Sequence, residues 1–99
     1  MKRIRLYPDG WKYEGELCDG KPHGQGILSH TDGTIFDGEW KMGSFDGQGI
    51  ETHLDGTKYV GAFKKGKRSG HGVLKHADGT IFEGEFKEGK FQKRKLKTS

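Results

Sequence analysis

Cysteine, proline and apolar residues are scarce in this sequence of 99 residues. Cys18 is the single cysteine, so no disulfide can form within the chain, which fits a reducing compartment and a cytoplasmic location. The chain has no apolar run of about 18 residues that could cross a membrane, and residues 1–10 lack the apolar segment of a secretory signal peptide. Only 29% of the residues are hydrophobic, so a conventional two-layer core would be thin.

Basic residues are concentrated at the two ends of the chain. The formal net charge is +4, and the ends carry eight basic residues and no acidic one: Lys2, Arg3, Arg5, Lys90, Lys93, Arg94, Lys95 and Lys97. Between these ends, ten basic residues are outnumbered by fourteen acidic ones. This distribution differs from the uniformly basic face of a nucleic-acid-binding domain, so we expect no nucleic-acid partner.

An internal repeat of 23 residues runs through almost the whole chain. An aromatic residue recurs at Tyr13, Phe36, Tyr59 and Phe82, and a glycine follows each of them two residues later. Gly-x-Gly and Asp-Gly pairs recur at the same spacing, and the repeat positions account for all 18 glycines. Glycine at this density argues against helices, because each one costs about 1 kcal/mol there.

Short runs of β-branched and aromatic residues between these turn signals predict strands. We expect eight strands, near residues 3–7, 11–17, 24–30, 34–40, 47–53, 57–63, 70–76 and 80–86. For Thr31-Asp32-Gly33 we expect a three-residue loop, in which a type I turn is followed by a glycine in the left-handed conformation. Loops this short predict an all-β fold: a single-layer antiparallel meander of tandem hairpin repeats, elongated and curved.

The alternation of side chains along these strands predicts one aromatic face. The implied register creates a row made only of glycine: Gly15, Gly26, Gly38, Gly49, Gly61, Gly72 and Gly84. Beside it lies the row Tyr13, Leu28, Phe36, Glu51, Tyr59, Leu74 and Phe82, and on its other side Leu17, Trp40, Phe63 and Phe86 alternate with Gly24, Gly47 and Gly70. Large rings can lie over glycines, so we expect the sheet to bend along the glycine row into an aromatic trough. Phe45 and Phe91 are expected in turns.

These residues resemble the MORN repeat, whose pattern is matched by Tyr13-Glu14-Gly15-Glu16-Leu17, Gly24-Gln25-Gly26 and Asp32-Gly33. The likeness covers about residues 4–91, although Lys93 and Lys95 stand where the fourth unit would carry Gly-x-Gly. It divides the chain into a partial repeat and edge strand (1–12), three repeats (13–35, 36–58 and 59–81), a partial fourth repeat (82–92) and a basic tail (93–99).

For function, the resemblance implies a binding or scaffolding module, because MORN repeats occur in scaffolds, in junctional membrane proteins and beside kinase or methyltransferase domains. A single-layer sheet has no second layer to cover its aromatic face, so we expect that face to bind a helix or an extended segment of a protein. The candidate protein-binding residues are Trp11, Tyr13, Phe36, Trp40, Glu51, Tyr59, Phe63, Phe82 and Phe86.

Glu51 is the only charged residue in its row, between Phe36 and Tyr59. A buried carboxylate without a partner would be costly, so we expect the middle of the trough to be open to water. A partner could then place a Lys or Arg on Glu51. The alternative is a solvated residue with no role in binding.

The basic ends have two interpretations. Lysines on edge strands oppose edge-to-edge aggregation, whereas near an anionic membrane each basic residue contributes about 1 kcal/mol of attraction. The second interpretation predicts a membrane-surface adaptor with lipid-binding residues Lys93, Arg94, Lys95 and Lys97. Edge strands left without a partner could also support a homo-oligomer. A third hypothesis is that the module positions an enzyme carried by another chain.

No pattern in the sequence predicts catalysis, a metal or a cofactor. His30, His53 and His76 occupy one repeat position, but equivalent residues two strands apart lie about 9–10 Å from each other and cannot share an ion. Three pairs of carboxylates recur on the outer face, where a solvated surface accounts for them: Glu14 and Glu16, Asp37 and Glu39, Glu83 and Glu85. We therefore expect a non-enzymatic module.

Overall fold

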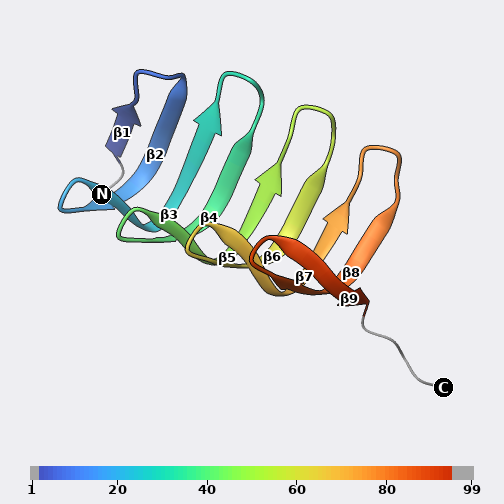
Figure 1. Cartoon of the computed structure of the whole chain (residues 1–99). Coiled ribbons are helices and arrows are strands. Elements are labelled where there is room, and N and C mark those ends of the chain that lie inside the picture. Colours follow the sequence, from blue (N-terminus) through green and yellow to red (C-terminus); the bar gives the residue numbers. More distant parts are fainter. Residues whose placement is uncertain (1–2, 95–99) are drawn as a thin grey trace.

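The computed structural model describes residues 3–94 of the chain. These residues form one sheet of nine antiparallel strands, in which neighbours in sequence are neighbours in space. The strands are β1 (Arg3–Leu6), β2 (Trp11–Cys18), β3 (Lys21–His30), β4 (Ile35–Lys41), β5 (Ser44–Thr52), β6 (Lys58–Lys64), β7 (Lys67–Lys75), β8 (Ile81–Lys87) and β9 (Lys90–Arg94). Figure 1 shows a single layer of hairpins, so the predicted antiparallel meander is confirmed. Within the described residues there is no helix that could cross a membrane.

Three strands begin earlier than predicted, and a ninth strand was not predicted. β3, β5 and β7 each start three residues before the expected position, because the turns that precede them contain only two residues. Asp19 and Gly20 form the first of these turns with φ angles of 52° and 78°, the type I′ conformation that matches the twist of the flanking strands. Phe45 and Phe91 consequently lie in β5 and β9 and not in turns, so that expectation was wrong.

The loops at the other end of the hairpins have three residues. In the loop Thr31-Asp32-Gly33, the N–H of Gly33 donates to the carbonyl of His30 at 3.0 Å, and the N–H of His30 donates to the carbonyl of Thr34 at 2.9 Å. Gly33 has a φ of 100°. This is the predicted type I turn followed by a left-handed glycine, and the prediction is confirmed.

The predicted glycine row is also confirmed. Backbone pairing aligns Gly15 with Gly26, and the same alignment continues through every pair of strands to Gly72 and Gly84. A methyl group at Gly26 would collide with the ring of Tyr13, and one at Gly72 would collide with the ring of Tyr59. The glycines therefore provide the space in which the rings of the inner face lie against the backbone.

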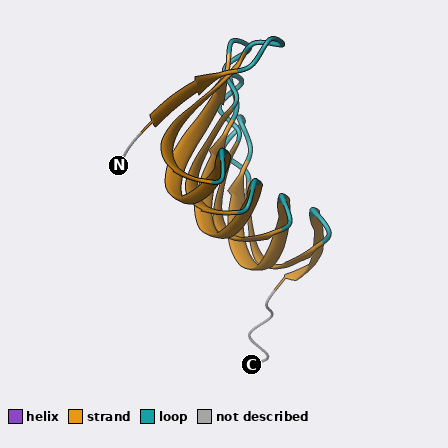
Figure 2. Ribbon diagram, turned by 90° about the vertical axis from the view of Figure 1, so that its left-hand side faces the viewer, coloured by secondary structure: helices purple, strands orange, loops and turns teal. Residues whose placement is uncertain are grey.

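The strands curl as they pass the glycine row, so that the sheet is strongly bent in cross-section (Figure 2). The two-residue turns stack on one another through backbone hydrogen bonds from Gly43 to the carbonyl of Pro22 at 2.8 Å and from Gly66 to the carbonyl of Phe45 at 2.9 Å. The next turn repeats the contact, from Gly89 to the carbonyl of Arg68 at 3.0 Å. The principal-axis extents are 49 × 25 × 19 Å, an elongated shape as predicted.

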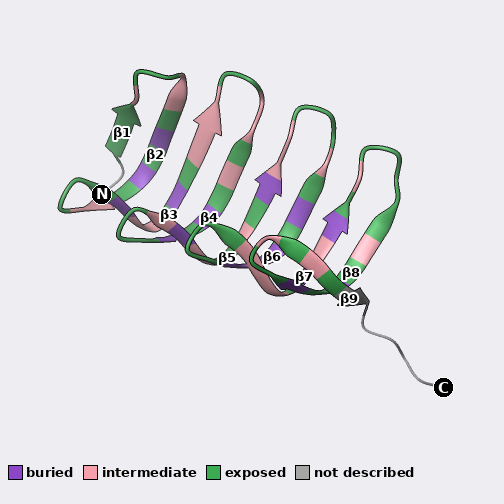
Figure 3. Ribbon diagram, in the orientation of Figure 1, coloured by how far each residue is buried: buried purple, intermediate pink, exposed green. Residues whose placement is uncertain are grey.

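The curl buries the inner face without a second layer. Figure 3 shows buried bands across the strands and exposed loops at both ends of the hairpins. The buried hydrophobic residues all come from this face: Tyr13, Trp40, Phe45, Tyr59, Phe63, Leu74 and Phe86. Their rings contact each other in a continuous series, for example 4.4 Å between the centroids of Phe45 and Phe63.

Two kinds of repeat alternate along the chain. Where the repeat begins with tyrosine, that ring covers the glycine of the following strand, and its hydroxyl donates to a backbone carbonyl, Tyr13 to Glu16 at 2.6 Å and Tyr59 to Ala62 at 3.0 Å. Where the repeat begins with Phe36, the glycine is covered instead by Phe45, nine residues later. The tyrosine repeats carry Pro22 or Arg68 at that later position. Gly26, Gly49 and Gly72 are therefore each covered by one aromatic ring, which comes either from the first residue of the repeat or from the residue nine positions later.

Candidate functional site

The nine candidate protein-binding residues all lie on the inner face, but most of them are buried. Tyr13 and Tyr59 are fully buried, and Trp40, Phe63 and Phe86 are at most 7% exposed. Trp11, Phe36 and Phe82 are half-buried. The expectation that the middle of the trough is open to water was therefore wrong, because the curl of the sheet brings the rings of neighbouring strands into contact with each other. Most of these rings form the core.

Glu51, which was expected to be unpaired and open to water, is buried and ion-paired. Its carboxylate accepts two hydrogen bonds from the guanidinium of Arg68, at 2.9 and 3.1 Å, and a third contact comes from the ring of His53. The Arg68 guanidinium lies 5.3 Å from the centre of the Tyr59 ring, so it closes over that ring. Burial raises the pKa of Glu51, but the hydrogen bonds from Arg68 and His53 outweigh it and hold that pKa below its usual value.

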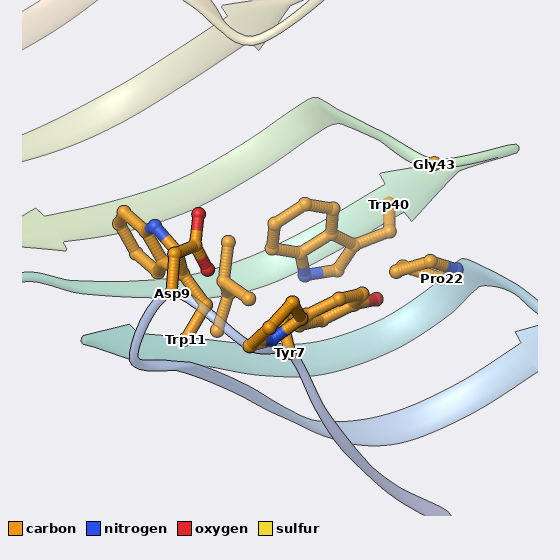
Figure 4. Close-up of a pocket in the computed structure, with 8 residues that line it drawn as sticks. Tyr7, Asp9, Trp11, Pro22, Trp40 and Gly43 are labelled. Carbon is orange, nitrogen blue, oxygen red and sulfur yellow. The ribbon is translucent and has the colours of Figure 1, made fainter.

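The inner face remains open at its N-terminal end. A groove with a volume of about 540 Å³ lies there, lined by Tyr7, Pro8, Asp9, Trp11, Pro22, Leu28, Trp40 and Gly43, and we call it the N-terminal groove. Figure 4 shows Asp9 and Trp11 at one end and Pro22 and Gly43 at the other, with Tyr7 and Trp40 between them. Trp11 and Trp40 are the two candidates from the sequence that line this groove.

The first loop differs from the other three at the positions that line the groove. The later loops have the pattern His-x-Asp-Gly-Thr, as in His30 to Thr34, whereas the first is Tyr7-Pro8-Asp9-Gly10-Trp11. In the later loops, the aspartate accepts a hydrogen bond from the N–H of the threonine, for example Asp32 from Thr34 at 2.9 Å. Among the described residues, none donates to the carboxylate of Asp9. The groove could have been predicted from the sequence of the first loop, which departs from the pattern of the other three.

The histidines of the later loops serve the packing of each repeat. The ring of His30 packs edge-on against Trp11, at 4.5 Å between centroids, and His76 packs against Phe82 in the same way at 5.3 Å. His53 contacts Glu51. Within residues 3–94, no group of three or more His, Cys, Asp or Glu side chains could hold a metal ion.

A comparison with models of known protein families finds a match over the whole repeat region. The family model of the MORN repeat matches residues 13–35, 36–58, 59–81 and 82–92. The chain belongs to the MORN-repeat family. MORN repeats form a non-catalytic repeat module and are found in scaffold and binding proteins. No curated protein matches this MORN-repeat chain.

A second surface of the MORN sheet is basic. Lysines of the β6–β7 and β8–β9 turns line a cavity of about 550 Å³, in which Glu88 is the one acidic lining residue; the others are Lys64, Lys65, Lys67, Arg68, Ser69 and Lys87. Of the candidate lipid-binding residues, the backbones of Lys93 and Arg94 belong to β9, and Lys95 and Lys97 lie outside the described residues.

The outer face is more apolar than predicted. The carboxylates of Glu14, Asp37 and Glu83 are exposed there, as expected. Aliphatic side chains lie between them in the same cross-strand row, where Ile27 is 40%, Ile50 36% and Val60 44% exposed. The outer face is therefore mixed, and a small cavity of about 190 Å³ on it is lined by Glu14, Ile27 and Asp37 together with the backbone around Gly15 and Gly26.

Proposed function

We propose that this MORN-repeat chain is a non-catalytic binding module that engages a protein segment through the open part of its aromatic face, the N-terminal groove. The observation that carries the proposal is the opening at one end of that face: Tyr7, Trp11 and Leu28 are half-buried around a cavity, whereas Tyr59, Phe63 and Phe86 are buried. Aromatic residues around an open cavity are the usual anchors of protein interfaces.

The residues around the groove support a binding role over a packing role. Tyr7 and Trp11 stand at the positions where the other loops have histidine and threonine. A ring in place of a threonine adds apolar surface that the described chain leaves partly exposed, at a cost in solvation of about 25 cal/mol for each Å². A bound segment would remove that surface from water.

The test is selection of binders from a random 12-residue peptide display library on the immobilised protein. Recovered peptides are then compared on the wild type and on Tyr7→His/Trp11→Thr, which gives the first loop the residues of the other three. We expect the double variant to bind at least tenfold more weakly, and the control Val60→Thr, on the outer face, to bind like the wild type. Binders that ignore the groove variant would refute the proposal.

A second candidate function, the membrane-surface adaptor, is supported by the basic cavity at the β6–β7 and β8–β9 turns. Each basic residue near an anionic surface contributes about 1 kcal/mol, and this attraction weakens with salt. Sedimentation with vesicles containing 30% phosphatidylserine should fall when Lys64, Lys65 and Lys67 are changed to glutamine, and it should fall further at high salt. Equal sedimentation of the wild type and this variant at low salt would exclude the turn surface.

A further inference from the structure

We propose that the N-terminal groove selects a proline-rich segment in the polyproline II conformation, with a lysine or arginine placed against Asp9. This proposal rests on the proposed function, because it names the chemistry of the segment that the groove would bind. Four observations carry it: the apolar lining, the unused hydrogen-bond donors, the uncommitted carboxylate and the direction of the groove.

The lining of the groove is suited to pyrrolidine rings. The half-buried Tyr7, Trp11 and Leu28 offer apolar surface, and the buried Trp40 and Pro22 form the bottom of the groove. A polyproline II segment is preformed in solution and loses little entropy on binding, which is why shallow aromatic grooves can recognise it.

The polar atoms at the rim favour an extended segment over a helix. The hydroxyl of Tyr7 and the indole N–H of Trp11 have no hydrogen-bond acceptor within residues 3–94, whereas the indole N–H of Trp40 donates to the carbonyl of Gly26 at 2.9 Å. A polyproline II segment has no internal hydrogen bonds, so its carbonyls can accept from both donors. A helix satisfies its own carbonyls and would leave these donors unused.

Strand addition does not fit the groove. The floor of the groove is the face of β2, β3 and β4, whose backbones are already paired, with Leu28 between Tyr13 and Phe36. An added strand needs an unpaired edge, which a sheet face does not provide. The segment must therefore bind through side-chain surfaces and through its own carbonyls.

Asp9 gives the groove its charge selectivity. The three equivalent aspartates, Asp32, Asp55 and Asp78, each accept the N–H of a threonine two residues later. Trp11 occupies that position in the first loop, and no described residue donates to the carboxylate of Asp9. Because Asp9 is exposed at one end of an apolar groove, it favours a cationic residue at the corresponding end of the segment.

The direction of the groove sets the length of the segment. It follows β3 from Leu28 to Pro22, which is about 20 Å of strand at 3.3 Å per residue. At 3.1 Å per residue, about six residues of polyproline II would span it. Six residues accommodate two proline contacts and one flanking basic residue.

The experiment compares two display libraries on the intact protein. One has a fixed Pro-x-x-Pro core with Arg or Lys at either flank, and the other is the random 12-residue library. We expect binders from the proline library to bind at least tenfold more weakly to Tyr7→His/Trp11→Thr. Asp9→Asn should weaken their binding about fivefold or more, while Asp55→Asn, the matched control, should leave it unchanged. Exchanging the flanking Arg for Glu should remove the effect of Asp9→Asn.

The outcomes separate this proposal from the proposed function. Binders that depend on Trp11 but come only from the random library, or that carry neither proline nor a basic flank, would overturn the polyproline assignment and leave the groove as a binding site. A fully retained affinity in Asp9→Asn would overturn the role of Asp9. If neither library yields binders that depend on Trp11, both proposals fail. Thermal unfolding of each variant, expected within a few degrees of the wild type, shows that the binding losses are local.

Discussion

Tyr13 and Tyr59 occupy the same position two repeats apart, yet their surroundings differ. Each is fully buried, lies over a glycine and donates its hydroxyl to a carbonyl three residues later. Around Tyr59, Arg68 reaches over the ring to Glu51. Around Tyr13, the equivalent residues are Pro22 and Arg5, and Arg5 turns away to the carbonyl of Gly20 at 2.9 Å. An ion pair thus covers the aromatic face beside Tyr59, whereas Pro22 and Arg5 form no such pair beside Tyr13.

This difference shows which positions define the fold and which define the surface. The ring, its glycine and the carbonyl that accepts the hydroxyl are shared by both repeats, and they set the curl of the sheet. The two residues that flank the ring across the strands are not shared. They decide whether the inner face is closed by a side chain or remains a groove, so function can change at these positions while the repeat is retained.

The largest effect is expected where the two repeats are alike. Gly26→Ala and Gly72→Ala each place a methyl group against a buried tyrosine ring that has no room to move. We expect each to lower the free energy of unfolding by about 3 kcal/mol, the upper end of the range for overpacking. Glu14→Ala, on the exposed outer face, should change it by less than about 0.5 kcal/mol. Urea denaturation measures the free energy of unfolding of all three variants. A clear difference between the two glycine variants would show that the two tyrosine repeats do not share the same packing.

The next effect concerns the closed repeat alone. Glu51→Leu leaves the guanidinium of Arg68 without its carboxylate in a half-buried site. Breaking a fully buried pair costs about 3–5 kcal/mol, and because Arg68 keeps some contact with water we expect about 2 kcal/mol here. The triple variant Glu51→Leu/Tyr59→Phe/Arg68→Phe gives this repeat the residues of its neighbour, in which Leu28, Phe36 and Phe45 pack together, and it should recover the wild-type stability.

The double variant Glu51→Leu/Arg68→Phe is the informative control. With Tyr59 retained, two rings compete for the space over Gly72, so this variant should be less stable than the triple variant. If the two variants are equally stable in urea, then the rule that each glycine receives one ring is wrong.

A smaller effect tests whether the open repeat can be closed. Arg5→Glu/Pro22→Arg transfers the pair of the closed repeat to the equivalent positions around Tyr13. We expect the new pair to show a coupling energy of about 1 kcal/mol in a double-mutant cycle. We also expect the tryptophan emission to shift to shorter wavelength as the pair excludes water from the groove that the half-buried Trp11 lines. Emission unchanged from that of the wild type would indicate that more than these two positions keeps the groove open.

The repeat pattern predicts the fold well because most of its positions have local causes. Glycine and Asp-Gly spacing predicted the loops, the register and the glycine row from physical preferences of single residues. The early starts of β5 and β7 were missed because Met42 and Lys65 adopt positive φ, which is uncommon for these side chains. β9 was missed because Lys93 and Lys95 stand where the equivalent strands β3, β5 and β7 carry their Gly-x-Gly pair.

The site was harder to predict than the fold. Alternation places Trp40, Tyr59 and Phe86 on the inner face, but it does not say how far the sheet curls, and the curl decides whether a ring is buried or exposed. The Glu51–Arg68 pair spans 17 residues and crosses an intervening strand, so no local pattern predicted it. The groove was detectable only in the departure of Tyr7 and Trp11 from the other loops.

The smallest expected effect concerns the three loops that have a threonine and the dependence of folding stability on pH. The backbone N–H of Thr34 holds the pKa of Asp32 below its usual value, and Thr57 and Thr80 do the same for Asp55 and Asp78. A pKa that is lower in the folded state stabilises the fold above the unfolded value, about 3.9 for aspartate. This stabilisation is lost as the pH falls through the folded values.

The loops with a threonine should therefore contribute to the acid sensitivity of the fold. Between pH 5 and pH 2.5, we expect the melting temperature of Asp32→Asn/Asp55→Asn/Asp78→Asn to fall less than that of the wild type, because an amide can still accept the threonine N–H but does not titrate. Glu51, whose pKa is also lowered, remains in both proteins and accounts for acid sensitivity that the triple variant retains. Calorimetric melting curves at several pH values measure the difference, and an equal fall in the two proteins would show that these three carboxylates do not contribute to acid sensitivity.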